Sequence, residues 1–137
     1  YQAVFQLLDY QYTNSLKKNK MNYASIELEK AKTHVTVEII EYVPDAMVSK
    51  TILKKLTGSI TAMAFENGEG MLEKTSPFDT YAQIIEGQAE LVIDGIPFLL
   101  HCGQSIIIPA HKPNLIRANG RFKMLQTVIK SGYEDVS

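Results

Sequence analysis

The sequence predicts an all-β domain, built as an antiparallel sandwich or barrel, over most of its length. Short runs rich in β-branched and aromatic residues recur at regular spacing, separated by glycine, proline, asparagine or aspartate. The length of 137 residues suits one domain, because a chain of this size buries about two-thirds of its surface on folding. Hydrophobic residues at 45% and charged residues at 21% are ordinary values for a globular protein.

Turn signals divide the part of the chain after Pro44 into strands. Thr57-Gly58 and Asn119-Gly120 each separate two apolar runs, and Asp94-Gly95 is the strongest short signal for a hairpin. Pro109 ends another run, because proline cannot donate to a strand ladder. The expected strands are 48–56, 59–66, 81–86, 89–94, 96–100, 105–108, 115–118 and 122–129.

The first third of the chain differs from this pattern. Residues 1–20 are dense in aromatic and leucine side chains, and two interpretations stay open for them. They are either a strand or helix that docks on the barrel or a partner subunit, or an extension upstream of a natural start at Met21. Charged residues predict a helix from about residue 24 to Lys32, and the alternation at 35–39 predicts a short strand or helical turn.

These patterns give a three-part organisation. We expect an N-terminal extension at residues 1–42, a β domain at 43–130 and a loose polar tail at 131–137. Part of the extension is a candidate helix. The formal net charge of −1 and pI of about 6.3 offer no electrostatic reason to expect nucleic acid or a membrane as a partner. The single cysteine, Cys102, cannot form an internal disulfide, so a cytoplasmic location is expected.

Two stretches of the β domain carry turn residues at a regular spacing. They read Gly68-x5-Lys74-x-Ser76-x3-Thr80-x6-Gly87 and Gly103-x5-Pro109-x-His111-x2-Asn114-x3-Ala118. The glycines and the proline resemble the two motifs of the cupin family in order and spacing, and glycine tolerates the backbone of tight turns. This resemblance covers roughly residues 43–130 and implies a double-stranded β-helix of the jelly-roll type.

The resemblance also implies a metal site, but its four ligand positions hold other residues. Where the family has His, His, Glu and His, this chain has Lys74, Ser76, Thr80 and Asn114. A charged ammonium has no free lone pair, hydroxyls are weak ligands for transition metals, and an amide oxygen suits a harder ion. We therefore expect no bound metal at this position and no cofactor.

The histidines and the cysteine are scattered. His111 stands where the second motif has a glycine, three residues before Asn114, and is either a displaced metal ligand or general base, or an exposed loop residue. The second interpretation is favoured, because His34 and His101 do not form a cluster with it, and His101 is expected on the surface. Cys102 is expected to be a small packing residue, because no histidine is evident as its base.

Part of the barrel lining follows from strand geometry and the resemblance. Thr80, Ala82 and Ile84 share one strand face, because side chains alternate along a strand. In the family this face looks inward, which implies a pocket lined by these three side chains. Ser76 and Asn114 would join Thr80 there as a neutral polar patch. Such a patch suits a neutral or singly charged small molecule, or equally ordered water alone.

Lys74 has two interpretations. If it points into the barrel, its cation can anchor a carboxylate or phosphate, or act as an amine nucleophile when desolvated. If it points outward, it pairs with Glu73 or Asp79 in a weak surface interaction.

Three functions are consistent with these residues. The favoured one is small-molecule binding in the barrel without a transition metal, because the ligand set is lost while the frame is kept. The second is an enzyme: a metal-independent isomerase or epimerase that uses His111 or Lys74, or a metal-dependent enzyme with displaced ligands such as His111. It ranks lower, because no second catalytic group accompanies either residue.

The third function is a structural or assembly role, with side chains filling the barrel. In each case we expect a homodimer, which the family resemblance implies and which would cover exposed sheet edges.

Overall fold

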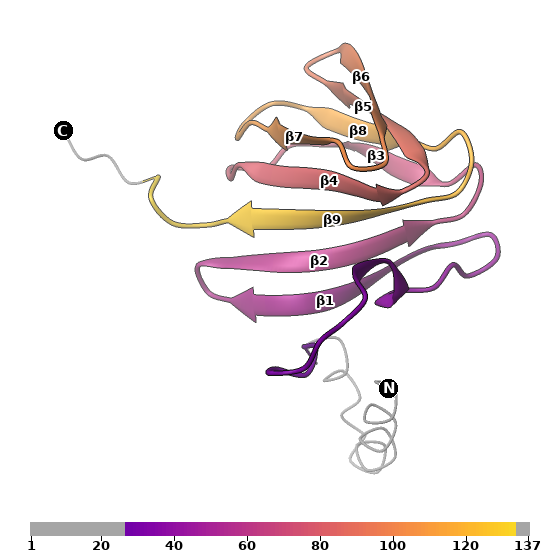
Figure 1. Cartoon of the computed structure of the whole chain (residues 1–137). Helices are drawn as coiled ribbons and strands as arrows, with labels where there is room; N and C mark the ends of the chain where they lie inside the picture. Colours follow the sequence, from indigo (N-terminus) through magenta and orange to yellow (C-terminus); the bar gives the residue numbers. More distant parts are fainter. Residues whose placement is uncertain (1–26, 134–137) are drawn as a thin grey trace, which may run out of the picture.

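The computed structural model of the chain describes residues 27–133, and its strands form two facing antiparallel sheets (Figure 1). The arrangement confirms the predicted all-β jelly roll. The five-stranded sheet has the order β1 (Met47–Lys55), β2 (Gly58–Phe65), β9 (Phe122–Ile129), β4 (Thr80–Glu86) and β7 (Ser105–Ile108). The four-stranded sheet has the order β3 (Gly70–Lys74), β8 (Asn114–Arg117), β5 (Gln88–Ile93) and β6 (Ile96–His101).

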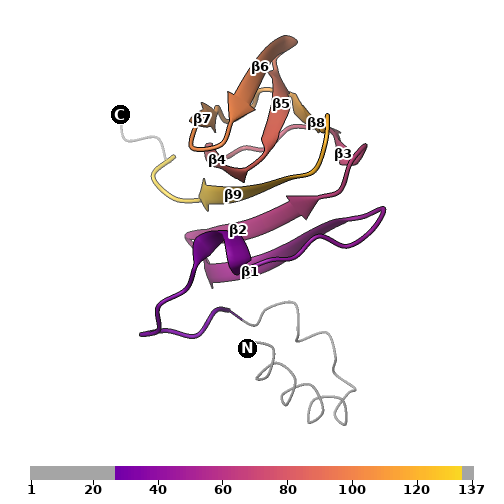
Figure 2. The ribbon, with the colours of Figure 1, turned by 45° about the vertical axis from the view of Figure 1, so that its right-hand side comes forward.

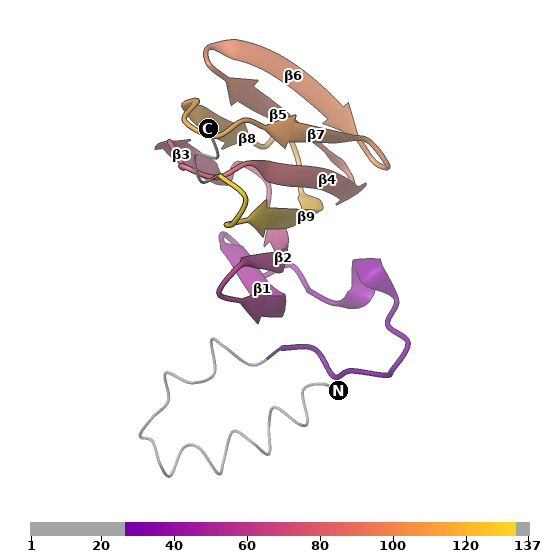
Figure 3. The ribbon, with the colours of Figure 1, turned by 90° about the vertical axis from the view of Figure 1, so that its left-hand side faces the viewer.

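Turn chemistry fixes the strand ends that the sequence predicts. Each of the eight expected strands is present, with both ends within one residue of the expected positions. The Asp94-Gly95 hairpin is confirmed, since Ile93 pairs with Ile96 and the two turn residues have φ values of 52° and 81°. This β5–β6 hairpin lies farthest from β1 (Figure 3).

Strand β3 was not expected from the sequence. Its Met71 is only partly buried and its Leu72 is 90% exposed, so it shows no apolar alternation. It forms because Gly70 and Met71 pair with β8 at the edge of the smaller sheet. A Cβ at Gly70 would lie 2.4 Å from the Ile116 carbonyl oxygen, so this close approach requires glycine.

The main core lies between the two sheets. Along β4 the residues alternate as predicted, with Thr80, Ala82 and Ile84 buried on one face. The rings of Phe65 and Phe122 stack with centroids 4.4 Å apart. This cluster consists of Met63, Phe65, Ala82, Ile84, Ala89, Leu91, Ile93, Leu100, Ile108, Ile116, Phe122 and Met124.

A second, smaller core lies on the outer face of the five-stranded sheet. The segment that precedes β1 crosses this face, where Ile40 packs on Ala62 and Ala64 of β2 (Figures 1 and 2). The short 3-10 helix η2 (Thr36–Glu38) belongs to this segment. Of the two alternatives for residues 35–39, the structure therefore contains the helical turn.

The helix expected up to Lys32 is wrong over residues 27–32, and its first residues lie outside the described part of the chain. Residues 27 and 28 instead hydrogen-bond to the edge of β1, and these tertiary contacts outweigh the local helix propensity. The Leu28 N–H donates to the Ile52 carbonyl at 3.2 Å, and the Lys54 N–H donates to the Glu27 carboxylate at 2.7 Å.

The alternatives for residues 1–20 also lie outside the described residues. Between residues 27 and 133 no helix has the length and apolar character required to cross a membrane.

Candidate ligand-binding site

A cavity of about 110 Å³ lies between the two sheets at one end of the barrel. Strands from both sheets contribute to it, because β3 ends there, β4 and β8 begin there, and β9 passes along its wall. Its lining residues are Lys74, Ser76, Phe78, Thr80, Ile108, Pro109, Asn114, Gln126 and Val128.

The structure brings together four of the seven sequence-predicted site residues. Lys74, Ser76, Thr80 and Asn114 all line this cavity. Ala82 and Ile84 share the inward face with Thr80, but they are fully buried in the main core and do not line the cavity.

His111, the seventh predicted residue, does not line the cavity. It is exposed, in agreement with the interpretation as a loop histidine. His111 has φ of 68°, a left-handed conformation that suits the glycine of the family motif. Its backbone N–H donates to the Ser76 carbonyl at 2.7 Å, so the residue ties together the two loops at the cavity mouth.

Lys74 and Asn114 form a reciprocal pair across the β3–β8 ladder. The Lys74 ammonium donates to Asn114 Oδ1 at 3.1 Å, and Asn114 Nδ2 donates to the carbonyls of Lys74 and Lys112 at 3.3 and 3.2 Å. The expected surface alternative, an ion pair of Lys74 with Glu73 or Asp79, is absent from the described residues. Much of the Lys74 side chain is exposed, yet partial burial lowers the pKa of its ammonium below the usual lysine value.

The loop between β3 and β4 is held by its own hydrogen bonds and by the chain after β9. The Phe78 N–H donates to Ser76 Oγ at 3.1 Å, and the Ala110 N–H donates to the Asp79 carboxylate at 2.8 Å. Tyr133 accepts the Asp79 N–H at its hydroxyl, 2.7 Å away, and its ring lies 5.8 Å from that of Phe78. These contacts fix the Phe78 wall of the cavity from outside.

Gln126 is a lining residue that the sequence analysis missed. It lies on β9 two residues after the buried Met124 and two before Val128, which shares the cavity wall. Its Nε2 atom is buried and has no hydrogen-bond partner in the described part of the chain. The signal was available, because alternation along β9 places Gln126 on the inward face.

The residues of the cavity do not fit the family's transition metal. Between residues 27 and 133, no three His, Cys, Asp or Glu side chains are grouped so that they could hold a metal ion. At the four motif positions, an ammonium, two hydroxyls and an amide replace imidazoles and a carboxylate. The amide oxygen of Asn114 is already occupied by the Lys74 ammonium, so this set offers no anionic or imidazole donor.

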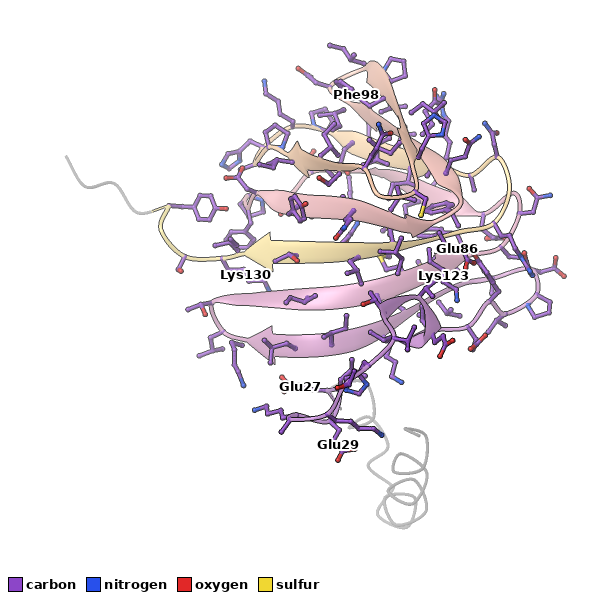
Figure 4. All side chains as sticks on the ribbon, viewed as in Figure 1. Glu27, Glu29, Glu86, Phe98, Lys123 and Lys130 are labelled. Carbon is purple, nitrogen blue, oxygen red and sulfur yellow. The ribbon has the colours of Figure 1, made fainter. Side chains whose placement is uncertain are left out.

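The opposite end of the barrel holds a different polar group, in which each member has a partner (Figure 4). The Lys123 ammonium donates to the Val37 carbonyl at 2.7 Å and lies 5.0 Å from the Tyr42 ring centroid. Tyr42 donates from its hydroxyl to Glu86 at 2.6 Å, and burial together with this carboxylate raises its pKa. Arg121 stacks on the same ring at 4.2 Å.

Two further predictions concern surface residues. His101 is exposed, as expected. Cys102 is also exposed, so the prediction of a packing role is wrong; its thiol donates to the Ile85 carbonyl at 3.3 Å instead.

A larger hollow of about 290 Å³ lies outside the barrel, between the 28–39 segment and Lys50 of β1. It contains none of the motif residues. His34 borders it, but the His34 ring nitrogen Nε2 lies 3.0 Å from the Glu29 carbonyl and is engaged within the loop.

Comparison with known proteins gives matches among solved structures alone. No family model matches the chain, and no curated protein matches it. A conserved protein of unknown function from Streptococcus pyogenes is 29% identical with a TM-score of 0.73, over 77% of this chain and 93% of that one. A cupin superfamily protein from Desulfitobacterium hafniense is 26% identical with a TM-score of 0.72, over 77% of this chain and 97% of that one.

A longer relative adds a further likeness. A cupin 2 conserved barrel domain protein from Leptotrichia buccalis is 30% identical with a TM-score of 0.66, over 69% of this chain. The match spans 46% of that protein, so this chain corresponds to about half of its length.

Proposed function

Because the chain belongs to the cupin superfamily and its cavity has no donor set for a transition metal, we propose that it binds a small molecule there without one. The observation that carries the proposal is the buried Nε2 of Gln126. An unsatisfied buried donor costs about 1–3 kcal/mol. Gln126 lines the cavity, so a turn of its side-chain amide would let a bound molecule with an acceptor offset that cost.

The size of the cavity supports a ligand with few non-hydrogen atoms. Its volume of about 110 Å³ is below the roughly 150 Å³ of an apolar cavity known to hold benzene. It is also well below the roughly 300–1,000 Å³ of sites for drug-sized ligands. The ligand is therefore small, or it inserts one small group into the barrel.

A binding role is better supported than catalysis. Lys74 is the one lining residue with an ionisable side chain, and acid–base chemistry commonly uses two positioned groups. His111, the other candidate for an acid or base, is exposed and outside the lining. The main core fills much of the space between the sheets, which supports a structural role there, but the cavity end carries polar groups that such a role does not use.

The metal part of the proposal is tested by elemental analysis. Protein purified without chelator and equilibrated with Mn²⁺, Fe²⁺ or Zn²⁺ should hold no stoichiometric metal. The matched variant carries Lys74→His, Ser76→His, Thr80→Glu and Asn114→His, and should take up metal if the barrel frame is intact. Stoichiometric metal in the natural chain would overturn this part.

The ligand part is tested by titration of a small-fragment library, followed through the Gln126 side-chain amide resonance. Ligands that enter the cavity should shift this resonance in the natural chain, and calorimetry should show them binding at least 10-fold more weakly to Gln126→Met. A library in which no fragment moves the resonance would contradict small-molecule binding in the cavity.

The proposal includes a homodimer and a cytoplasmic location. Exposed apolar side chains on the edge strands, Ile96, Phe98 and Leu99 of β6 and Ile107 of β7, support association of two copies. The free, exposed thiol of Cys102 supports a reducing compartment. Light scattering on the purified chain would give the mass that decides the first point, and a monomer would contradict it.

A further inference from the structure

We propose that the ligand class is a short-chain carboxylate, held by the Lys74 ammonium at one carboxylate oxygen, with the Gln126 side-chain amide turned toward the other. This inference rests on the proposed function and adds the chemistry that the cavity selects. It follows from the charges, the donors and the apolar wall of the lining residues.

The charge of the lining favours an anion. Lys74 is the single cation among the nine lining residues, and none of the nine is an aspartate or glutamate. The nearby carboxylate of Asp79 is occupied by the Ala110 N–H and does not line the cavity. A ligand carboxylate would therefore meet a cation without a competing side-chain anion in the lining.

Several hydrogen-bonding groups of the lining can donate to a ligand. Of the three ammonium protons on Lys74, one reaches Asn114 Oδ1, and no other acceptor within the described residues receives a bond from this group. Ser76 accepts from the Phe78 N–H and keeps its own hydroxyl proton to donate. The Gln126 side-chain amide, whose Nε2 has no partner among the described residues, also lines the cavity. Such a set selects a ligand rich in acceptor oxygens.

The amide of Asn114 cannot compete for the same ligand. Its oxygen accepts from Lys74, and its nitrogen donates to two carbonyls, so its groups are already engaged. Asn114 instead holds the ammonium at the end of β3. Lys74 then lies on the four-stranded sheet and Gln126 on the five-stranded sheet, so a ligand that reaches both joins the two sheets.

The rest of the lining is apolar and can contact the hydrocarbon part of a ligand. Phe78, Ile108, Pro109 and Val128 supply apolar surface beside the polar groups. A cavity of about 110 Å³ with one cationic end and one apolar wall suits a carboxylate of about two to four carbons. Acetate, propionate, butyrate, lactate and pyruvate are probes of this class.

The test compares each carboxylate with a neutral ligand of the same shape. Acetate, propionate and butyrate are titrated into the full chain beside acetamide, propionamide and butyramide, with the Gln126 side-chain amide resonance as the reporter. We expect carboxylates to bind at least 10-fold more tightly than the matched amides. Their affinity should fall as pH rises toward 10.5, because the pKa of Lys74 lies below that ordinary value.

Two lysine variants identify the cation. Lys74→Gln keeps a donor for Asn114 but removes the charge, and should weaken carboxylate binding at least 10-fold with little effect on the amides. Lys112→Gln is the matched control, because Lys112 lies in the loop before β8 and forms an exposed ion pair with Asp94 at 3.6 Å. It should leave carboxylate affinity unchanged.

The outcomes distinguish the carboxylate class from the more general proposal that a small molecule binds in the cavity. If amides bind as tightly as carboxylates, or if Lys74→Gln changes nothing, the carboxylate class is wrong while small-molecule binding stands. If carboxylates fail but other fragments of the library move the Gln126 resonance, the class is again wrong. If no ligand moves it, both proposals fail together.

Discussion

Lys123 and Gln126 lie three residues apart on β9. The polar group of Lys123 has protein partners, whereas the side-chain nitrogen of Gln126 has none among the described residues. Lys123 is 5% exposed, yet its ammonium meets the Val37 carbonyl and the Tyr42 ring on the outer face of the sheet. Gln126 points into the barrel, where its Nε2 meets no acceptor from the described residues. A buried polar group whose partners are all in the protein contributes to the fold, whereas one without protein partners needs another explanation, which we propose is a ligand.

Lys123→Met is the substitution with the largest expected effect on this comparison. It removes a charge-assisted hydrogen bond and leaves the Val37 carbonyl without its donor, which should lower the free energy of unfolding by about 1.5–3 kcal/mol. Urea denaturation measures the change. The control is Lys54→Met at an exposed position of β1, whose free energy of unfolding should stay within about 0.5 kcal/mol of the natural chain. A variant as stable as the natural chain would show that the outer network does not stabilise the fold.

Gln126→Met should act in the opposite direction on stability. It replaces an unpaired buried donor with an apolar side chain of similar length, so the free energy of unfolding should stay the same or rise by up to about 1 kcal/mol. The same urea experiment applies. A loss of 2 kcal/mol or more would mean that Gln126 has a structural role, and the contrast with Lys123 would then fail.

Glu66→Gln should have the smallest effect and should depend on pH. The Arg121 guanidinium, which lies 2.8 Å from the carboxylate, lowers the pKa of Glu66 below its usual 4.5. A lowered carboxyl pKa stabilises the fold above the unfolded-state value, and this contribution is lost as pH falls through the folded-state value. The difference in melting temperature between Glu66→Gln and the natural chain should be present at pH 7 and should shrink as the pH falls below 4.5.

A constant difference in melting temperature across that pH range would contradict the role of the Arg121 pair. Glu69→Gln is a suitable control, because it removes one partly exposed carboxylate in the same loop region. Glu69→Gln should show little dependence on pH.

Most of the fold followed from local sequence signals. Turn residues and period-two alternation located eight strands, because both signals depend on neighbours in sequence. Strand β3 and the segment before β1 could not be predicted in this way. Gly70 and Met71 become a strand by pairing with β8, and Leu28 is drawn to β1 by a bond to Ile52.

The candidate site could be predicted only in part from the sequence. Motif spacing identified Lys74, Ser76, Thr80 and Asn114, which line one cavity. It could not indicate that Lys74 and Asn114 hydrogen-bond each other, since that depends on the register between two strands 40 residues apart. Gln126 lies in neither motif, and only its position on the inward face of β9 links it to the others.

The reciprocal pair of Lys74 and Asn114 also limits how this barrel can evolve. A single mutation of Lys74 to histidine would take the ammonium from Asn114 Oδ1, and a single mutation of Asn114 to histidine would remove the acceptor that holds Lys74. Each first step toward a metal ligand thus breaks an existing contact before any ion can compensate. The two positions are therefore expected to be energetically coupled, so that introducing histidines here one at a time would lower stability at each step.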